Sequence, residues 1–402
     1  MFDRKINARL RQWKERKPKK PLLLRGARQV GKSTIVNQFG KKYSSFISLN
    51  LEKKSDAAFF ENESDDISEI FSKIVLDRNI PFLEDDTLLF IDEIQEVPNA
   101  IKQLRYFYED VPRLDVIAAG SLLEFAIGDV SSFPVGRIEY MNLYPMDFEE
   151  FLGALGEEML LEYYRQIPVL PIAHNKLLQL FNTYIQVGGM PEVVSAYISG
   201  GKKIESLGRV YETIWDTYVR DIEKYGSNPS ERKILRHIVH TSPFVRDRIS
   251  FNGFGNSNYR SREVGEAFRK LDKVGLIRLV YPTSDTDLPA QLKFKRKPKL
   301  QFLDTGLLNY AAGIQSSMIG VSDMNSLYKG YITNHMVVQE LIATNNDWRN
   351  LPPFWTRENA NANAEVDIVI SHKNKLVPIE VKSGKKGRLR SLHEYMLSLI
   401  HI

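Results

Sequence analysis

The sequence predicts an α/β fold with a parallel sheet over residues 20–150, and three observations carry this prediction. Short apolar segments alternate there with longer segments of helical spacing. A glycine-rich loop, GARQVGKS (26–33), separates one apolar segment from a helical one. Another apolar segment, TLLFIDE (87–93), ends in two acidic residues. Such alternation is typical of parallel strands that are joined by helices.

Five segments are expected to form the strands of this sheet. Each is short, rich in aliphatic or aromatic residues, and bounded by polar or glycine-containing turns. They are PLLLRG (21–26), SFISLNLE (45–52), TLLFIDEI (87–94), LDVIAAGS (114–121) and RIEYMNLYP (137–145).

The rest of the chain is expected to hold further domains. Residues 147–225 are mostly helical, with a turn at VGGMPEV (187–193). Between 229 and 283, apolar residues keep helical spacing up to Gly275, where a strand follows, so this part indicates a winged-helix unit. Mixed α/β structure then returns, including a helix near 329–344. The predicted domains are 1–145, 146–225, 226–285 and 286–402.

Composition excludes several classes of protein. The hydrophobic share of 43% and the charged share of 26% are typical of soluble globular proteins. The chain has no cysteine, which excludes disulfides and cysteine–zinc sites. No apolar run is long enough for a membrane span, and the charged N-terminus does not resemble a secretory signal, so we expect a cytoplasmic protein. The net charge of +5 is concentrated in residues 1–20, which hold nine Lys/Arg and two acidic residues.

The loop GARQVGKS fits the phosphate-binding pattern G-x-x-x-x-G-K-[ST] in the right context, between a strand and a helix. Backbone N–H groups and the helix N-terminus supply fixed positive partial charge for a triphosphate. Lys32 is expected to reach the β- and γ-phosphates, and the Ser33 hydroxyl to bind Mg²⁺. The predicted nucleotide-binding residues are Gly26, Ala27, Arg28, Gln29, Val30, Gly31, Lys32, Ser33 and Thr34.

Acidic and polar residues at later strand ends complete this prediction. Asp92 is expected to hold Mg²⁺, and Glu93 to act as general base toward the attacking water. Ser121, after the strand VIAAG, is a candidate sensor of the γ-phosphate or a simple turn residue. Arg137 is a candidate arginine finger or a surface arginine at a strand start.

A second candidate site lies in EVDIVISHKNKLVPIEVKSG (365–384). If two strands pair through HKNK, alternation brings Asp367, Glu380 and Lys382 to one face, with Val377, Ile379 and Val381 opposite. Two carboxylates and a lysine suit a hard cation and an attacking water, and Glu340 is a candidate further ligand. A solvated, charged strand pair has the same pattern, so both interpretations stay open.

Several segments together resemble a prokaryotic family of AAA-type ATP-binding proteins with a C-terminal domain of unknown function. The resemblance implies an AAA-like core, a winged helix and a restriction-endonuclease-like domain of the PD-(D/E)xK kind. By position it gives Lys32, Ser33, Asp92 and Glu93 the ATPase roles, and matches Asp367, Glu380 and Lys382 to the nuclease-like motif. Because the chain ends soon after Gly384, the resemblance also implies a terminal domain without its last strand. The matching segments are the phosphate loop with Arg28, LLFIDEIQ, AAGS, GRIEYMNLYPMDFEEF, GGMPE, YVRDIEKYG, LQFLDTGLL and EVDIVI with PIEVKSG.

The sequence therefore predicts a Mg²⁺-dependent ATPase that acts as a switch or remodeller. DNA contact is expected through KFKRKPK (293–299) and KSGKKGRLR (382–390), where the alternative is a solvated basic edge. Two other functions stay open: an ATP-gated scaffold that binds a protein partner, and an ATP-regulated, metal-dependent nuclease. A homo-oligomer is expected if a neighbouring copy supplies the arginine finger.

Overall fold

The computed structural model describes residues 2–62, 66–80, 86–121, 123, 134, 136–315, 330–345, 351–357, 364–382 and 390–400. The chain divides into two compact units, Met1–Tyr144 and Pro145–Ile402. None of the described helices combines the length and apolar composition needed to cross a bilayer.

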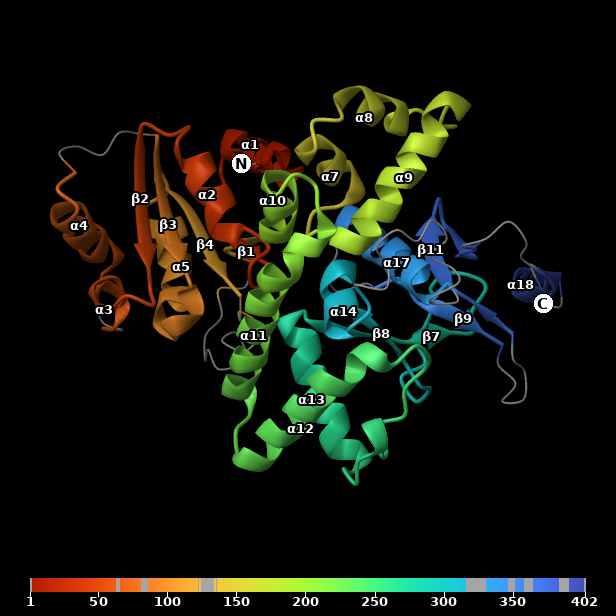
Figure 1. Cartoon of the computed structure of the whole chain (residues 1–402). Helices are drawn as coiled ribbons and strands as arrows, with labels where there is room; N and C mark the ends of the chain where they lie inside the picture. The colour runs from red at the N-terminus through yellow and green to blue at the C-terminus, as the bar shows by residue number, and fades with distance from the viewer. Residues whose placement is uncertain are drawn as a thin grey trace. The chain divides into compact units, whose positions relative to one another are not determined.

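The first unit is built on a five-stranded parallel sheet in the order β2-β3-β4-β1-β5 (Figure 1). This confirms the predicted strands and their parallel arrangement. Since all strands run the same way, their carboxyl ends meet at one edge, where ligands bind in sheets of this type. The strands are β1 (Leu22–Arg25), β2 (Ser45–Asn50), β3 (Thr87–Asp92), β4 (Asp115–Gly120) and β5 (Glu139–Asn142).

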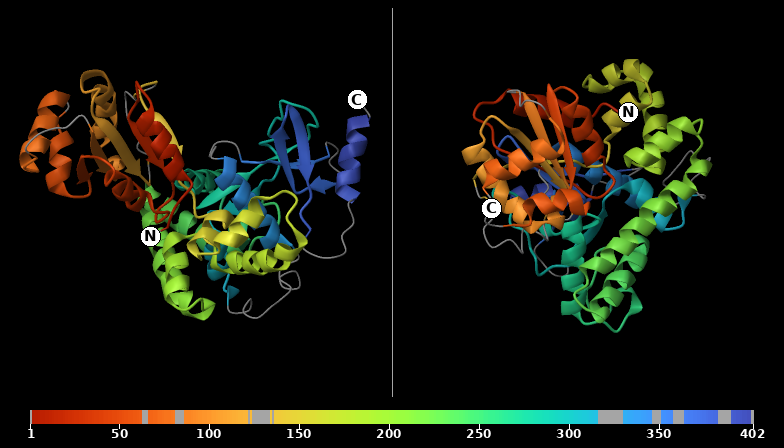
Figure 2. Two further views of the ribbon diagram at one scale, coloured as in Figure 1. Left: turned by 90° about the horizontal axis from the view of Figure 1, so that it is seen from above. Right: turned by 90° about the vertical axis from the view of Figure 1, so that its left-hand side faces the viewer.

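Helices cover both faces of this sheet (Figure 2), which explains why β3 and β4 are buried along their whole length. Helices α4 and α5 pack one face through a core that includes Leu23, Leu89 and Leu104. Helix α2 contacts β2, β3 and β4, and α1 packs against α2. The helices are α1 (Ile6–Glu15), α2 (Lys32–Gly40), α3 (Lys54–Ala57), α4 (Ile67–Asp77) and α5 (Pro98–Asp110), with short 3-10 turns η1 (Ala58–Phe60) and η2 (Ile94–Glu96).

The basic N-terminal segment is part of this unit. Leu10 and Trp13 are fully buried in α1, and the Trp13 indole donates a hydrogen bond to the Lys20 carbonyl at 3.0 Å. Lys19 pairs with Asp115 at 2.5 Å. Residues 1–20 therefore combine their positive charge with an apolar helix face that packs within the first unit.

The second unit is mostly helical in its first half, and the predicted helical region with its turn at 187–193 is confirmed. Its helices are α7 (Phe148–Ala154), α8 (Glu158–Arg165), α9 (Pro171–Val187), α10 (Pro191–Ser199), α11 (Gly208–Tyr225), α12 (Pro229–Thr241), α13 (Ser261–Val274), α14 (Thr305–Ala311), α17 (Tyr331–Asn345) and α18 (Arg390–Ile400). The 3-10 turns are η3 (Ile204–Leu207), η4 (Ser242–Phe244) and η5 (Phe254–Asn256).

The described residues of the second unit also form three small sheets. The strands are β6 (Ile277–Val280), β7 (Pro282–Thr283), β8 (Lys299–Phe302), β9 (Phe354–Thr356), β10 (Glu365–Val366), β11 (Ile368–His372) and β12 (Lys375–Ile379). They form the sheets β6-β8, β10-β9-β7 and β11-β12. As predicted, α13 ends at Gly275, whose φ of 78° is left-handed, and β6 follows. Strands β6 and β7, which precede residue 286, pair with β8 and β9, which follow it. The predicted boundary between residues 285 and 286 therefore does not separate two hydrogen-bonded units.

The C-terminal hairpin differs in part from its prediction. The turn is where HKNK predicts it, with Lys373 and Asn374 at positive φ. The predicted apolar face of the second strand is wrong, because Leu376 is buried while Val377 is 36% exposed. The backbone breaks its pattern at Asp367, since β10 pairs with β9 whereas β11 pairs with β12. Strict alternation across residues 365–370 is therefore lost.

A buried polar network joins the turn before α10 to α14 and α17. The Asp304 carboxylate accepts hydrogen bonds from Gly189 N at 2.6 Å, Leu307 N at 2.9 Å and Gln339 Nε2 at 3.3 Å. Position 189 requires glycine, because a Cβ there would lie 2.1 Å from the Met146 carbonyl oxygen. This network fixes the segment GGMPE against LDTGLL, two motifs more than a hundred residues apart.

His335 is held neutral inside the same network. Its Nε2 accepts from Phe302 N at 2.9 Å, so Nδ1 carries the proton and donates to Thr305 Oγ1 at 2.9 Å. The Thr305 hydroxyl in turn donates to Gln339 Oε1 at 2.9 Å. Burial lowers the pKa of His335 from 6.5 to about 3.

This lowered pKa predicts that acid destabilises the second unit. Below about pH 6.5, His335 is protonated in the unfolded chain but stays neutral in the folded one. The free energy of unfolding therefore falls progressively toward pH 3, by up to about 1.4 kcal/mol per pH unit. Urea unfolding at several pH values between 7.5 and 4.5 measures the slope. His335→Gln should be less stable at pH 7.5 but show a shallower slope. Equal slopes for the two proteins would contradict this account.

Candidate functional site

The loop Gly26–Ser33 joins β1 to α2 and is shaped by three residues at positive φ. Gly26 has φ 156°, Gln29 has φ 61° and Gly31 has φ 97°. A Cβ on Gly26 would lie 2.4 Å from the Leu143 carbonyl oxygen, so only glycine fits. Within the described residues no side chain caps α2 at Gly31. The first N–H groups of α2 are therefore left for an anion.

Lys32 lies inside this loop and is 6% exposed. Its ammonium donates to the carbonyl oxygens of Gly26 at 3.0 Å and Ala27 at 2.9 Å. Burial lowers the pKa of Lys32 to about 8, opposed by the charges of Glu93 and Asp92. A buried cation that donates to neutral carbonyl oxygens is well placed to exchange them for phosphate oxygens, which carry full charge.

Asp92 ends β3 beside the loop and is 9% exposed. Burial raises the pKa of Asp92, and a hydrogen bond from the Ser33 side chain opposes that rise. Its Oδ1 also accepts from Glu93 N at 3.1 Å. The Ser33 hydroxyl and the Asp92 carboxylate are thus hydrogen-bonded neighbours and form an oxygen donor pair of the kind that Mg²⁺ prefers.

Glu93 follows in a left-handed conformation, with φ 50° and ψ 44°. Such backbone strain on a residue other than glycine is concentrated at functional sites. Gln95 Nε2 donates to Glu93 Oε2 at 2.6 Å, and a Cβ on Gly120 would lie 2.2 Å from Gln95 Oε1. Gln95 therefore reaches from Glu93 to the end of β4. The sequence prediction missed this residue, although its position two residues after Glu93 was visible in IDEIQ.

Ser121 comes next after Gly120 and is 7% exposed. Its hydroxyl makes no hydrogen bond within the described part of the chain. Since β4 lies between β3 and β1, Ser121 emerges between Asp92 and the phosphate loop. A buried hydroxyl in that place is suited to a ligand oxygen.

The remaining predicted residues are placed as follows. Arg28 lies near enough to Lys32 for its charge to lower the pKa of Lys32. Val30 is fully buried, whereas Thr34 is exposed on the first turn of α2. Arg137 precedes β5, so it lies at the amino edge of the sheet, and its Nε pairs with Glu109 at 3.1 Å. The structure does not bring Arg137 to the phosphate loop of its own chain.

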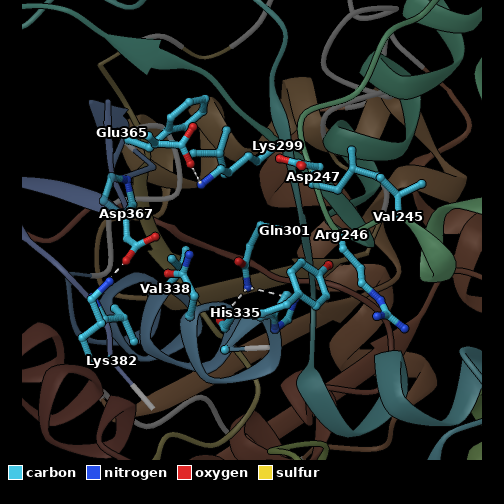
Figure 3. A pocket seen from close by; sticks show the side chains of 18 residues that line it. Val245, Arg246, Asp247, Lys299, Gln301, His335, Val338, Glu365, Asp367 and Lys382 are labelled. Carbon is cyan, nitrogen blue, oxygen red and sulfur yellow. Dashed lines mark hydrogen bonds and ion pairs between the residues drawn. The ribbon is translucent and has the colours of Figure 1, made fainter. Parts of the chain in front are cut away.

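A second candidate site is a cavity of about 370 Å³ inside the second unit. Figure 3 shows Glu365, Asp367 and Lys382 on one side of it and Arg246 and Asp247 on the other. The wall also includes β8 and the face of α17 that carries Asn334, His335 and Val338. The sequence prediction missed the α17 residues, because apolar and polar residues are mixed around this helix and its pattern marks no preferred face.

The structure brings Asp367, Glu380 and Lys382 near one another. Asp367 Oδ2 accepts from Val381 N at 3.0 Å, and Lys382 Nζ pairs with Glu380 Oε1 at 2.5 Å. Burial raises the pKa of Asp367, with a further rise from the charge of Glu380. Within the described residues no three acidic or histidine side chains form a cluster that could hold a metal ion by themselves.

Glu340 does not belong to this cavity, so the prediction that it adds a metal ligand is wrong. Its carboxylate accepts from Phe148 N at 3.1 Å and from the Tyr184 hydroxyl at 2.8 Å. Helical geometry explains the difference, since residues 338 and 340 of α17 point in nearly opposite directions, about 160° apart around the axis. Glu340 therefore holds α7 and α9 in place.

The basic segment 293–299 is largely engaged within the second unit. Arg296 donates to Thr356 Oγ1 at 2.7 Å and to the Arg357 carbonyl at 2.9 Å. Lys299 pairs with Glu365, and Lys293 lies 3.7 Å from Asp285. Lys295 and Lys297 are exposed. Most of the other expected basic segment, residues 383–389, lies outside the described residues.

Comparisons with known proteins agree with the first of these sites. Residues 18–152 match the family described as an AAA domain. Residues 178–318 and 329–399 match two domains of unknown function, DUF8612 and DUF4143. An uncharacterized protein of Haemophilus influenzae is 24% identical over 309 residues, which cover 72% of this chain and 69% of that protein.

Among solved structures, the Walker-type ATPase PABY2304 of Pyrococcus abyssi is similar with a TM-score of 0.49 and 16% identity. The likeness covers 77% of this chain and 96% of that one. The phosphate loop, Asp92 and Glu93 all lie within the segment that matches the AAA domain. The segment that holds the phosphate loop is thus similar to AAA domains, and the segments after it match domains of unknown function.

Proposed function

We propose that this protein hydrolyses ATP at the carboxyl edge of its parallel sheet. The observation that carries the proposal is the meeting there of a phosphate loop, a buried lysine and two adjacent carboxylates, Asp92 and Glu93. A protein that only binds nucleotide has no need of the second carboxylate. Glu93 is held in a strained left-handed conformation, which is expected of a residue that takes part in chemistry.

Each residue has a distinct part in this proposal. The N–H groups of the loop and of the first turn of α2 bind the phosphates, and Lys32 shifts from the Gly26 and Ala27 carbonyls to the β- and γ-phosphate oxygens. Glu93 accepts a proton from the attacking water. Gln95 orients the Glu93 carboxylate through the 2.6 Å bond, and Ser121 contacts the γ-phosphate.

Ser33 and Asp92 are the residues that would hold Mg²⁺. The hydrogen bond from Ser33 to Asp92 shows that these oxygen donors already lie together, which fits a small, hard cation. When bound, this ion neutralises charge on the phosphates during transfer.

The direct test is phosphate release from ATP by the full-length protein. Turnover is expected with Mg²⁺ and is expected to stop with excess EDTA. Addition of double-stranded or single-stranded DNA then tests the proposal that the protein is a switch or remodeller acting on DNA. Absence of turnover under all these conditions, together with normal ATP binding, would favour the ATP-gated scaffold.

A homo-oligomer remains part of the proposal. Because Arg137 lies away from its own phosphate loop, it acts as an arginine finger only if it reaches the site of a neighbouring copy. Light scattering with and without ATP tests for such an assembly.

A second candidate function, an ATP-regulated nuclease, is supported by the approach of Asp367 and Lys382 in the cavity of the second unit. Supercoiled plasmid incubated with Mg²⁺ or Mn²⁺ is expected to be nicked by the wild type, and the nicking is expected to be lost in Asp367→Asn. Asp287→Asn, at an exposed position, is the matched control. If the wild type does not cut, or Asp367→Asn cuts equally, the cavity has no nuclease function.

A further inference from the structure

Arg4 is a buried arginine that contacts the phosphate loop from outside the matched AAA segment. It is 5% exposed and lies just before α1. Its Nη1 donates to the Val30 carbonyl at 3.3 Å, and its Nη2 donates to the Tyr144 carbonyl at 2.7 Å. One guanidinium thus links the tip of the phosphate loop to the last residue of the first unit. The match to the AAA domain begins only at residue 18.

The contact at Val30 bears on ligand binding because of peptide geometry. In a planar trans peptide the C=O and N–H bonds point in opposite directions. Since Arg4 holds the Val30 carbonyl, the N–H of the same peptide, which belongs to Gly31, is turned away from Arg4. Gly31 has φ 97° and directly precedes the first turn of α2, so this N–H is one of the donors available to phosphate.

The rest of the N-terminal segment holds Arg4 in place. Asn7 Nδ2 donates to Asp3 Oδ1 at 2.8 Å across the start of α1. Ile6, Leu10 and Trp13 are buried, and α1 packs on α2, the helix that the phosphate loop begins. A side chain fixed beside a docked helix is ordered before the nucleotide arrives, so its ordering costs nothing at the moment of binding.

We infer that Arg4 is a positioning residue for nucleotide binding, which orients the Val30–Gly31 peptide so that its N–H faces the phosphates. The basic N-terminal segment then serves the nucleotide site rather than a nucleic acid. This inference rests on the proposed function, because it concerns the same site. It predicts that loss of the Arg4 guanidinium weakens ATP binding, although Arg4 itself does not contact ATP. The effect is transmitted by the orientation of the phosphate loop.

The test compares Arg4→Met with Arg16→Met in the full-length protein. Arg16 is a matched control because it lies in the same basic segment, but its side chain is 53% exposed and pairs with Glu139 at the surface. The Kd for Mg-ATP is measured by calorimetry, and Tm is measured without nucleotide. Arg4→Met is expected to raise Kd about tenfold, whereas Arg16→Met stays within about twofold of the wild type. Arg4→Lys, which retains one donor group, is expected to fall between them.

The outcomes separate this inference from the proposed function. If the wild type binds no ATP, the proposed function fails as well. If the wild type binds ATP and the Kd of Arg4→Met stays within about twofold, only the role of Arg4 is lost, even where Tm falls. Should Arg4→Met fail to fold, Arg4→Lys decides by the same criterion, because it keeps the charge and much of the volume.

Discussion

Replacement of Lys32 by alanine is expected to raise the Kd for Mg-ATP by at least about 100-fold and to abolish turnover, a loss on the order of 2.7 kcal/mol or more in binding. The reason is the position of Lys32, which is 6% exposed and donates to the Gly26 and Ala27 carbonyls inside the loop. Calorimetry with ATP and phosphate release measure the two effects.

Lys41→Ala is the control for this experiment. Lys41 directly follows the same helix and is exposed, so its loss changes the net charge equally without altering the loop. It should bind and hydrolyse ATP as the wild type does. Normal turnover by Lys32→Ala would refute the assignment of the ATP site, and equal losses in both variants would point to bulk charge instead.

Glu93→Gln is expected to keep ATP binding and to lower kcat by about 100- to 1,000-fold, the usual contribution of a general base. Glutamine has nearly the same shape and still lies beside Gln95, but its amide cannot accept a proton from water. Kd should therefore change little while kcat falls, the pattern of a group that acts only in the transition state.

Glu69→Gln, at an exposed position on α4, provides the matched control for loss of one carboxylate. It is expected to retain full kcat. A Glu93→Gln protein that turns over ATP normally would remove Glu93 as the base. If Glu93→Gln instead loses ATP binding, Glu93 contacts the bound ground state. Its assignment as a group that acts only in the transition state would then be wrong.

Local sequence determined the first unit and the residues of its nucleotide site. Each strand is specified by its own apolar run, and the phosphate loop is complete within GARQVGKS. Asp92 and Glu93 were assignable because residues at the carboxyl ends of parallel strands must share one edge. These inferences need only neighbours in the chain and one rule of sheet geometry.

The hairpin shows where such reasoning stops. Alternation predicted Val377 on the apolar face of its strand, but Leu376 is buried instead, and β10 and β11 take different partners around Asp367. Register depends on the strands with which each segment pairs. The sequence of a single strand carries no record of those partners.

Tertiary structure alone decided which distant groups meet. Arg4 contacts Val30 across 26 positions and Tyr144 across 140, and Glu340 contacts Phe148 across 192. Arg137 lies at the amino edge with Glu109, although its sequence position beside a strand was read correctly. The sequence pattern around such charged residues does not show whether they are buried, because a long, flexible side chain can lie on the surface or link two buried groups. Only the packing of the elements around each of them determines which it becomes.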